Sequence, residues 1–359
     1  MGVEAARVHS AWQGRISGCI LGKPVEVLSF QQGLEGLTAY LLKTDALPLR
    51  NYIPSLEGTL VAKVGLGCCR DQIRRAEPDD DINYTVLALM ILERNGLNFD
   101  TPDVARAWLQ LLPAGATWTA ERAAYRVLLG NMDDEFVNGS DAGFDLAACA
   151  DNDYNEWIGA QIRADLYGWV SPGRPALAAD MARRDASLSH RGNGVHGAEF
   201  IAALGAAIPA TRDLDEAIDA ALECIPTGCG AASAVVTGRQ LAGQSDAVDK
   251  LYEEYGDLSP VHTLNNLALV VWALCDAQGD FSAAIGNAVA AGWDTDCNGA
   301  TVGGLCGLSG AAIPDTWTKP WQGRVALSLA GYDELSLDDL VSRTIAVANE
   351  FNGDAHAIH

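Results

Sequence analysis

Basic residues are scarce in this sequence. It contains 24 Lys and Arg against 47 Asp and Glu, which gives a formal charge of −23 at neutral pH. Non-specific nucleic-acid binding needs cations that neutralise phosphates, and anionic membrane surfaces attract the same basic side chains. The charge balance therefore argues against nucleic-acid and membrane partners. Most of the acidic excess is expected on the solvated surface, where it favours solubility.

Long apolar runs and paired cysteine motifs are also missing. No stretch of about 18 uncharged apolar residues occurs, so no membrane span is expected. Residues 1–30 lack a basic segment followed by a long apolar run, so no signal peptide is expected. None of the nine cysteines forms a Cys-x-x-Cys pair, and most lie in apolar context, as buried reduced thiols do. These features favour a cytoplasmic location.

Alternation of apolar and polar residues, the pattern of strands, is not convincing anywhere, whereas helical spacing recurs through most of the chain. The spacing predicts helices over 82–95, 101–112, 119–130, 156–169, 175–187, 197–208, 213–224, 263–277, 281–292 and 336–351. Gly and Pro mark the joins, and no low-complexity linker divides the chain. We therefore expect one all-α domain over residues 1–359.

Two segments do not fit the helical pattern. Residues 33–75 carry scattered Gly and Pro with few clear periods, so we expect an irregular excursion near the mouth of a cleft. Residues 352–359 are short and polar and are expected to fray. His356 and His359 are accordingly interpreted as tail residues, not as ligands.

Two acidic clusters precede apolar helical runs: Asp79-Asp80-Asp81 and, much later, Asp294-Thr295-Asp296. Carboxylates are favoured at helix N-termini, where unpaired N–H groups and the helix dipole present partial positive charge. Neighbouring residues diverge by about 100°, so two of a trio can converge on a cation while the third caps the helix. Clustered carboxylates repel one another, and oxygen ligands suit Mg²⁺, Mn²⁺ or Ca²⁺. The alternative is an acidic helix cap that binds no metal.

Three motifs in order resemble the ADP-ribosylglycohydrolase family, which includes the dinitrogenase-reductase-activating glycohydrolases and the crystallin J1 relatives. They are the segment 14–26 (GRISGCILGKPVE), the acidic trio before a helix, and the segment 292–301 (GWDTDCNGAT). They extend from residue 14 to about residue 310. The resemblance implies a compact, largely orthogonal helical bundle with metal ions in a central cleft.

The resemblance also implies the metal ligands. They are Asp79, Asp80, Asp81, Asp294, Asp296 and Cys297. The chain departs from the family pattern at two of these positions, because Asp79 replaces the usual Thr or Ser and Cys297 replaces the last Thr of Asp-Thr-Asp-Thr. A thiol is a poor ligand for Mg²⁺. We therefore expect two ions of Mg²⁺ or Mn²⁺. Because of Cys297, the sequence does not decide whether the second site is occupied.

Glu26 and Asp81 are the candidate catalytic residues. The glutamate at the end of the family's first motif borders the metal cleft, and it contacts the metal or the reacting water. A carboxylate beside a metal can accept a proton from water, and Glu26 or a metal-bound carboxylate such as Asp81 can take that role. The alternative for Glu26 is a surface glutamate at a turn.

Two further segments are candidates for substrate binding. Residues 159–165 resemble the family's Gly-Ala-x-x-Arg stretch that lines the substrate pocket, which suggests Arg163 and Asp165. A buried structural arginine is the alternative for Arg163. The Gly-rich segment 189–197 leads into a helix, whose N–H groups can bind a phosphate or ribose oxygen. We expect His190, Asn193 and Gly194 to contribute there, unless they only cap or pack.

Three functions remain open. The first is a divalent-metal-dependent hydrolase of a ribosyl N- or O-glycosidic bond, acting on an ADP-ribosylated protein or on a small ribosyl compound such as a nucleoside. The second is a non-catalytic crystallin-like member of the fold, and the third is a divalent-metal phosphohydrolase. His-Asp, P-loop and Gly-x-Ser-x-Gly motifs are missing, so other common hydrolase schemes are disfavoured. The sequence leaves the leaving group and the oligomeric state open.

Overall fold

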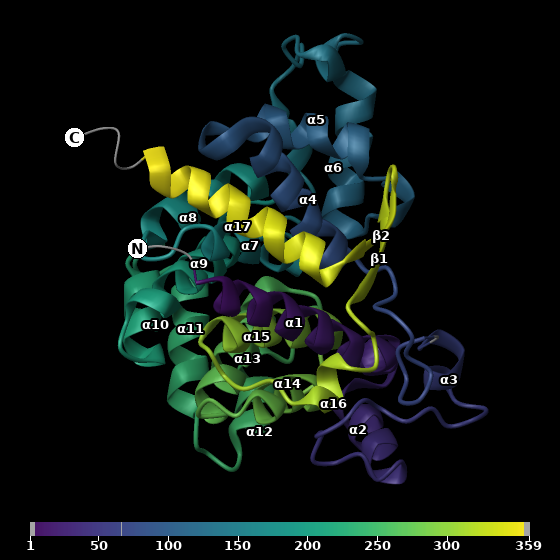
Figure 1. The fold of residues 1–359 in the computed structure, drawn as a ribbon. Coiled ribbons are helices and arrows are strands. Elements are labelled where there is room, and N and C mark those ends of the chain that lie inside the picture. Colours follow the sequence, from purple (N-terminus) through teal and green to yellow (C-terminus); the bar gives the residue numbers. More distant parts are fainter. Residues whose placement is uncertain (1–3, 66, 355–359) are drawn as a thin grey trace.

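The computed structural model describes residues 4–65 and 67–354, and most of them are helical (Figure 1). The α-helices are α1 (Ala5–Gly22), α2 (Glu26–Lys43), α3 (Leu60–Val64), α4 (Asp80–Asn95), α5 (Thr101–Leu111), α6 (Thr119–Asn131), α7 (Asp165–Trp169), α8 (Pro175–Ala186), α9 (Gly192–Ala207), α10 (Leu214–Leu222), α11 (Gly230–Leu241), α12 (Ala247–Tyr255), α13 (Thr263–Asp276), α14 (Phe281–Ala290), α15 (Thr295–Leu308), α16 (Asp315–Thr318) and α17 (Leu337–Asp354). The predicted all-α class is confirmed.

Short elements connect these helices. The 3₁₀ turns are η1 (Lys23–Val25), η2 (Gly96–Asn98), η3 (Ala114–Ala116), η4 (Phe136–Asn138), η5 (Leu146–Ala150), η6 (Ile158–Arg163) and η7 (Ile208–Ala210). Strands β1 (Arg324–Leu329) and β2 (Tyr332–Ser336) form one antiparallel hairpin. The hairpin contacts α4, because the N–H of Ser328 donates to the side-chain oxygen of Asn83 over 2.9 Å.

Helices α1 and α15 pack so closely that their backbones touch at glycines. A Cβ atom on Gly18 would lie 1.8 Å from the carbonyl oxygen of Gly299, and one on Gly14 would lie 2.0 Å from that of Gly303. Only glycine permits this separation, because any side chain would overlap the facing backbone. The contact continues to Gly22, whose carbonyl oxygen accepts a hydrogen bond from the Thr295 hydroxyl at 2.9 Å. The end of α1 is thereby held against the start of α15.

Helices α1, α15 and α17 occupy the middle of the molecule (Figure 1). In that view α4, α5 and α6 lie on one side of them, and α10 to α14 lie on the other. The indole N–H of Trp12 on α1 donates to the Thr344 hydroxyl on α17 over 3.0 Å. The buried apolar side chains form one cluster that extends from Val8 to Phe351. The described residues therefore share one hydrophobic core.

Several expectations about local structure need correction. The segment 33–75 is only partly irregular, because residues 33–43 continue α2 past a kink at Gly33 (φ 63°, ψ −167°) and α3 follows at 60–64. The predicted helix 156–169 is divided into η6 and α7. The hairpin at 324–336 was not expected, because the alternation of apolar and polar residues there is confined to two very short strands. Helix α9 begins at Gly192, several residues before the predicted start at 197.

The C-terminal helix is longer than expected. The helical backbone of α17 continues to Asp354, into the segment that was expected to fray. His356 and His359 lie outside the described residues. None of the described helices is long and apolar enough to cross a membrane.

The α1–α15 contact can be tested by adding one methyl group. Gly18→Ala should destabilise the protein by about 1–3 kcal/mol or prevent folding, because the new Cβ atom overlaps the Gly299 carbonyl. Gly130→Ala is the matched control, since Gly130 is an exposed glycine of α6 with no atom near the added Cβ. That variant should gain up to about 1 kcal/mol through helix propensity. Urea unfolding of both variants measures the difference, and equal stability would contradict the close contact.

Candidate functional site

A cavity of about 770 Å³ lies where the two acidic helix starts meet. Its acidic wall consists of Glu26, Asp79, Asp80, Glu121, Asp294 and Asp296. The rest of the lining is largely apolar and includes Phe30, Trp118, Trp157, Pro260 and Val261. Trp118 is 56% exposed, which is unusual for a tryptophan side chain. Cavities of this volume bind small molecules of drug or nucleoside size.

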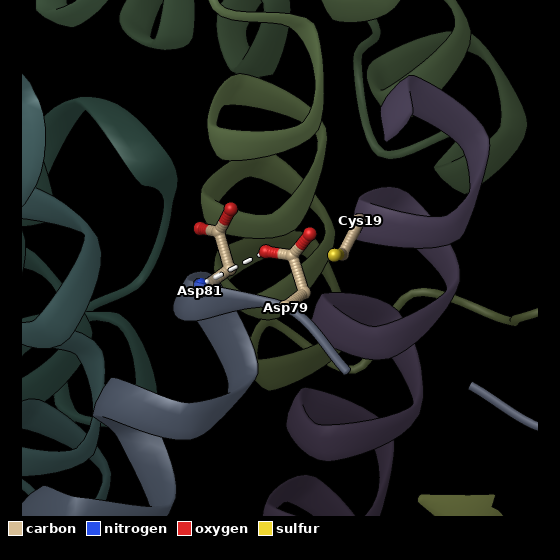
Figure 2. Close-up of side chains that lie close together, drawn as sticks. All are labelled: Cys19, Asp79 and Asp81. Atoms are coloured by element: carbon tan, nitrogen blue, oxygen red, sulfur yellow. Dashed lines mark hydrogen bonds between the residues drawn. The ribbon is translucent and has the colours of Figure 1, made fainter. Parts of the chain in front are cut away.

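Asp79 caps the N-terminus of α4. Its backbone is extended (φ −150°, ψ 149°), and its Oδ1 accepts the N–H of Asp81 at 3.0 Å. Figure 2 shows this bond and the Cys19 side chain of α1 pointing toward the same carboxylate. The Oδ2 atom of Asp79 forms an ion pair with the ammonium of Lys23, which also donates to the carbonyl of Pro78 over 2.8 Å. Both oxygens of Asp79 therefore have partners within the protein.

Asp81 is completely buried and contacts an equally buried arginine. The Nη2 atom of Arg15 lies 3.2 Å from Asp81 Oδ1 and also donates to the Asp81 carbonyl at 2.9 Å. The other guanidinium arm lies 2.8 Å from Asp165 Oδ2. Oδ2 of Asp81 has no hydrogen-bond partner. One oxygen of Asp81 is therefore neutralised and the other is free to bind a cation.

Asp294 and Asp296 flank the start of α15, and both are nearly fully buried. The Oδ1 atom of each has no hydrogen-bond partner. Asn266 on α13 holds this helix start, because its Oδ1 accepts from the Asn298 side chain at 2.7 Å and from the Asp294 N–H at 3.3 Å. Asn266 is fixed in turn by donating to the carbonyls of Pro260 and His262, both over 2.8 Å. The two carboxylates are thus held by the fold, not by ion pairs.

The carboxylates converge in three overlapping groups whose ligand atoms lie within 4.8 Å of one another. The groups are Cys19, Asp79 and Asp81; Asp81, Asp296 and Cys297; and Glu26, Asp294 and Asp296. A buried acceptor without a partner is costly, and three such oxygens occur here, on Asp81, Asp294 and Asp296. Unpaired carboxylate oxygens at this spacing fit a hard divalent cation. The residues present therefore suit Mg²⁺ or Mn²⁺.

Burial raises the pKa of most acids at the site. The pKa of Glu26 is raised well above its usual value by desolvation and by the nearby charge of Asp296. Burial also raises the pKa of Asp80, Asp81 and Asp294, and it raises that of Asp296 to about 6. Asp79 differs, because the pKa of its carboxyl is lowered: Lys23 and the backbone N–H of Asp81 outweigh its burial. Burial keeps the Cys297 thiol protonated by raising its pKa.

Arg163 at the end of η6 and Asp165 at the start of α7, both predicted to bind substrate, do not line the cavity. Arg163 is buried, donates to Glu121 Oε1 at 2.7 Å and forms an ion pair with Asp185. Its guanidinium therefore has internal partners, which matches the structural alternative considered for it. Asp165 pairs with Arg15, and the pKa of this carboxyl is raised by burial to about 6. Both residues lie behind the cavity wall.

The Gly-rich loop also stands apart from the cavity lining. His190 is buried, and its Nδ1 shares a hydrogen bond of 2.8 Å with the Ser189 hydroxyl. Burial and the charge of Arg163 lower its pKa well below the usual value, so its 3.9 Å contact with Glu121 is not an ion pair. The N–H of Asn193 donates to Glu156 Oε1 at 2.8 Å. A Cβ atom on Gly194 would lie 2.3 Å from the Asn155 carbonyl.

Several site residues were missed at the level of sequence. Lys23 lies within the first motif, three residues before Glu26, but was given no role of its own. Arg15 directly precedes the largely apolar second half of α1, residues 16–22, and a charge beside such a stretch is a recognisable sign of a buried ion pair. Glu121 and Asn266 carried no signal, because their roles depend on neighbours more than 25 residues away in the chain.

The molecule is a helical protein in which the acidic N-termini of α4 and α15 meet at one cavity. The sequence profile of the ADP-ribosylglycohydrolases matches residues 3–349. The chain therefore belongs to the ADP-ribosylglycohydrolase family, and its general class is that of hydrolases of glycosidic bonds. No curated protein sequence matches it.

The fold is also found in solved structures. A chain described as "ADP-ribosylglycohydrolase-related protein complex" is similar, with a TM-score of 0.61 and 19% identity. The similarity covers 96% of this chain and 98% of that chain. It shows that the fold is shared over nearly the whole length of both.

The raised pKa of Asp296 predicts a pH-dependent stability of the metal-free protein. An aspartate ionises near pH 3.8 when unfolded and near pH 6 here, so the folded state retains a proton over that interval. The free energy of unfolding should therefore fall as the pH rises from about 4 to about 6, by up to about 3 kcal/mol from this group. Asp296→Asn cannot ionise and should become more stable relative to the wild type over the same interval.

Urea titrations in EDTA between pH 4 and pH 7.5 measure this effect. Asp333→Asn serves as the control, because Asp333 is exposed in the hairpin and should give a constant difference from the wild type. Saturating Mn²⁺ should reverse the advantage of Asp296→Asn near pH 7, since binding to the folded state stabilises the wild type. A difference between wild type and Asp296→Asn that does not change with pH would refute the assignment.

Proposed function

We propose that this protein is a divalent-metal-dependent hydrolase that cleaves a ribosyl N- or O-glycosidic bond, with Mg²⁺ or Mn²⁺ as its cofactor. The observation that carries the proposal is that Asp294 and Asp296, each with an unpartnered buried oxygen, converge with Glu26 at the wall of one cavity. A bound divalent cation would supply a Lewis acid for ribose hydroxyls and for water. The catalytic and metal-binding roles of these residues are part of the proposal.

Glu26 is the proposed general base. It is half-buried at the first turn of α2, borders the cavity, and has Asp294 and Asp296 within 4.8 Å of its carboxylate. The raised pKa of its carboxyl gives Glu26 a proton affinity closer to that of a base that works near neutral pH. A water beside Glu26 would lose its proton to this carboxylate as it attacks the anomeric carbon. Asp81 is the alternative acceptor, through its free Oδ2.

The acidic wall suits the transition state of glycoside cleavage. Positive charge develops on the sugar ring as the glycosidic bond breaks, in a state that resembles an oxocarbenium ion. Carboxylates held in place before the reaction stabilise that charge without reorganisation. Asp80 and Glu121 line the same wall, although they belong to none of the three ligand groups. They are placed to act on the substrate electrostatically.

The cavity favours a small ribosyl compound such as a nucleoside. Phe30, Trp118 and Trp157 offer aromatic surface for a flat leaving group. Lys23 is the only basic side chain among the described residues that line the cavity, and it is paired with Asp79. A diphosphate would therefore meet carboxylates without a free cation. An ADP-ribosylated protein is the less favoured substrate.

The charge of the lining also supports the expectation that neither nucleic acid nor a membrane is a partner. A cytoplasmic location is part of this proposal, supported by the fact that all nine cysteines are free thiols. A phosphohydrolase or a non-catalytic protein remains a defined outcome of product analysis. Release of free ribose, or of the free base from a nucleoside, supports glycosidic cleavage. Release of inorganic phosphate supports the phosphohydrolase. The absence of both products supports the crystallin-like alternative.

Glu26→Gln tests the proposed base. The substitution keeps the shape of the side chain but removes the basic oxygen, so turnover of any accepted ribosyl substrate should fall by about 10²- to 10⁴-fold. The change in melting temperature on adding Mn²⁺ should remain, because Asp81, Asp294 and Asp296 are intact. Turnover is measured by chromatography of the products with a panel of nucleosides and ADP-ribose, in Mn²⁺ and in EDTA.

Glu57→Gln is the matched control for charge and size, since Glu57 is exposed in the loop before α3. It should behave as the wild type in both assays. Turnover by Glu26→Gln within a factor of two of the wild type would show that Glu26 is not the base. Equal turnover in EDTA and in Mn²⁺ would refute the metal dependence.

A further inference from the structure

We propose that Lys23 acts as a built-in cation of this centre, and that the chain consequently binds one divalent ion, not two. The single ion would be held by the free oxygens of Asp294 and Asp296, with Glu26 beside it. This inference rests on the proposed function, because it concerns the same carboxylates. It differs from the expectation of two ions that family resemblance suggests.

The first observation is the position of the Lys23 ammonium. It forms an ion pair with Asp79 Oδ2 and donates to the Pro78 carbonyl at 2.8 Å, so it sits directly against the start of α4. Lys23 belongs to η1, which follows α1 without a break, and the α1–α15 contact fixes that position. Its side chain is three-quarters buried. The ammonium is therefore part of the centre and not a mobile surface charge.

The second observation is that both oxygens of Asp79 already have partners within the protein. Oδ2 is paired with Lys23, while Oδ1 accepts the N–H of Asp81 at 3.0 Å as the helix cap. A metal ion at Asp79 would lie beside the Lys23 ammonium and be repelled by it. Asp79 therefore acts as the partner of Lys23 and as the cap of α4.

The third observation is that the remaining ligands of the Asp79 group are poor. That group consists of Cys19, Asp79 and Asp81 (Figure 2). The thiol of Cys19 is a soft ligand and suits Mg²⁺ or Mn²⁺ badly. Asp81 already has Oδ1 against the Arg15 guanidinium at 3.2 Å. A second divalent ion here would also lie beside the Lys23 ammonium and be repelled by it.

The free oxygens lie on the other side of the cluster. Asp81 Oδ2, Asp294 Oδ1 and Asp296 Oδ1 are all buried and without hydrogen-bond partners. Glu26, Asp294 and Asp296 form one group whose ligand atoms lie within 4.8 Å of one another, so these three acids can face one common position. Asp81 shares a group only with Asp296 and Cys297, whose thiol is a poor ligand for a hard cation, and with Cys19 and Asp79. Lys23 and Arg15 thus neutralise Asp79 and Asp81. One divalent ion would neutralise Asp294 and Asp296.

The number of bound ions tests the inference directly. Equilibrium dialysis of the full chain against Mn²⁺, followed by elemental analysis, should give one ion per wild-type chain. Lys23→Met removes the ammonium and frees Asp79 Oδ2, so this variant should bind a second ion more weakly. Lys23→Arg keeps the charge and should bind one. Lys319→Met is the matched control, because Lys319 forms an exposed ion pair with Asp315 and should leave one ion bound.

Cys297→Thr separates the lysine from a rival explanation. Cys297 lies in the group with Asp81 and Asp296, so the loss of a hydroxyl ligand there is another reason for a missing second ion. If Lys23 is responsible, Cys297→Thr alone should still bind one ion. A second ion in Cys297→Thr with Lys23 intact would overturn the inference, as would two ions in the wild type or one ion in Lys23→Met.

Thermal melts keep the result interpretable. Lys23→Met leaves Asp79 unpaired and should melt below the wild type in EDTA, and it should gain more from Mn²⁺ than the wild type does. If Lys23→Met folds only in the presence of Mn²⁺, the dialysis starts from the Mn²⁺-loaded variant, which should still retain two ions where the wild type retains one.

The outcome is distinguishable from that of the proposed function. A wild type that binds two ions and still releases ribose overturns this inference alone. One bound ion with no ribosyl product from any substrate overturns the proposed function alone. A wild type that binds no Mn²⁺ overturns both the inference and the proposed metal dependence.

Discussion

The contact between the glycines of α1 and the backbone of α15 is the constraint on which the candidate site depends. It brings the end of α1 against the start of α15, so that Glu26 and the pair Asp294 and Asp296 lie at one cavity although about 270 residues separate them in the chain. A side chain at Gly18 would separate the two helices and move one set of carboxylates away from the other. The glycine spacing in the first motif therefore has a structural role that precedes any chemistry.

The site concentrates like charges in a buried place, which costs stability. Desolvation raises the pKa of Glu26, Asp81, Asp294 and Asp296, which means that each ionised form is disfavoured in the fold. Lys23 and Arg15 offset part of this cost, each by pairing with one carboxylate of the first cluster. Within residues 4–65 and 67–354, no basic side chain forms an ion pair with Asp294 or Asp296 of the second cluster. A protein that retains unpaired buried carboxylates sacrifices stability for a binding or catalytic role, as functional sites commonly do.

Much of the fold class and of the acidic centre could be predicted from the sequence, because both depend on local pattern. Helical periodicity indicated the all-α class, and the placement of Asp79 and Asp294 before apolar runs correctly indicated two helix N-termini. The substrate-binding assignments of Arg163, Asp165, His190, Asn193 and Gly194 stay predictions, and the cavity lining includes none of them. Those side chains are held by Glu121, Arg15, Ser189 and Glu156, and long-range pairing of this kind leaves no local signal.

The sequence by itself determined which residues could form helices, where those helices begin with carboxylates, and that the chain carries too little positive charge for a polyanionic partner. Those properties follow from residue type and spacing over a few turns. Only the tertiary structure decided which carboxylate oxygens remain free. That outcome depends on whether Lys23 reaches Asp79 and whether Arg15 reaches Asp81, and both distances are set by the packing of α1 against the rest of the fold. Cation binding depends on individual unpaired oxygens, which no spacing of residues along the chain can specify.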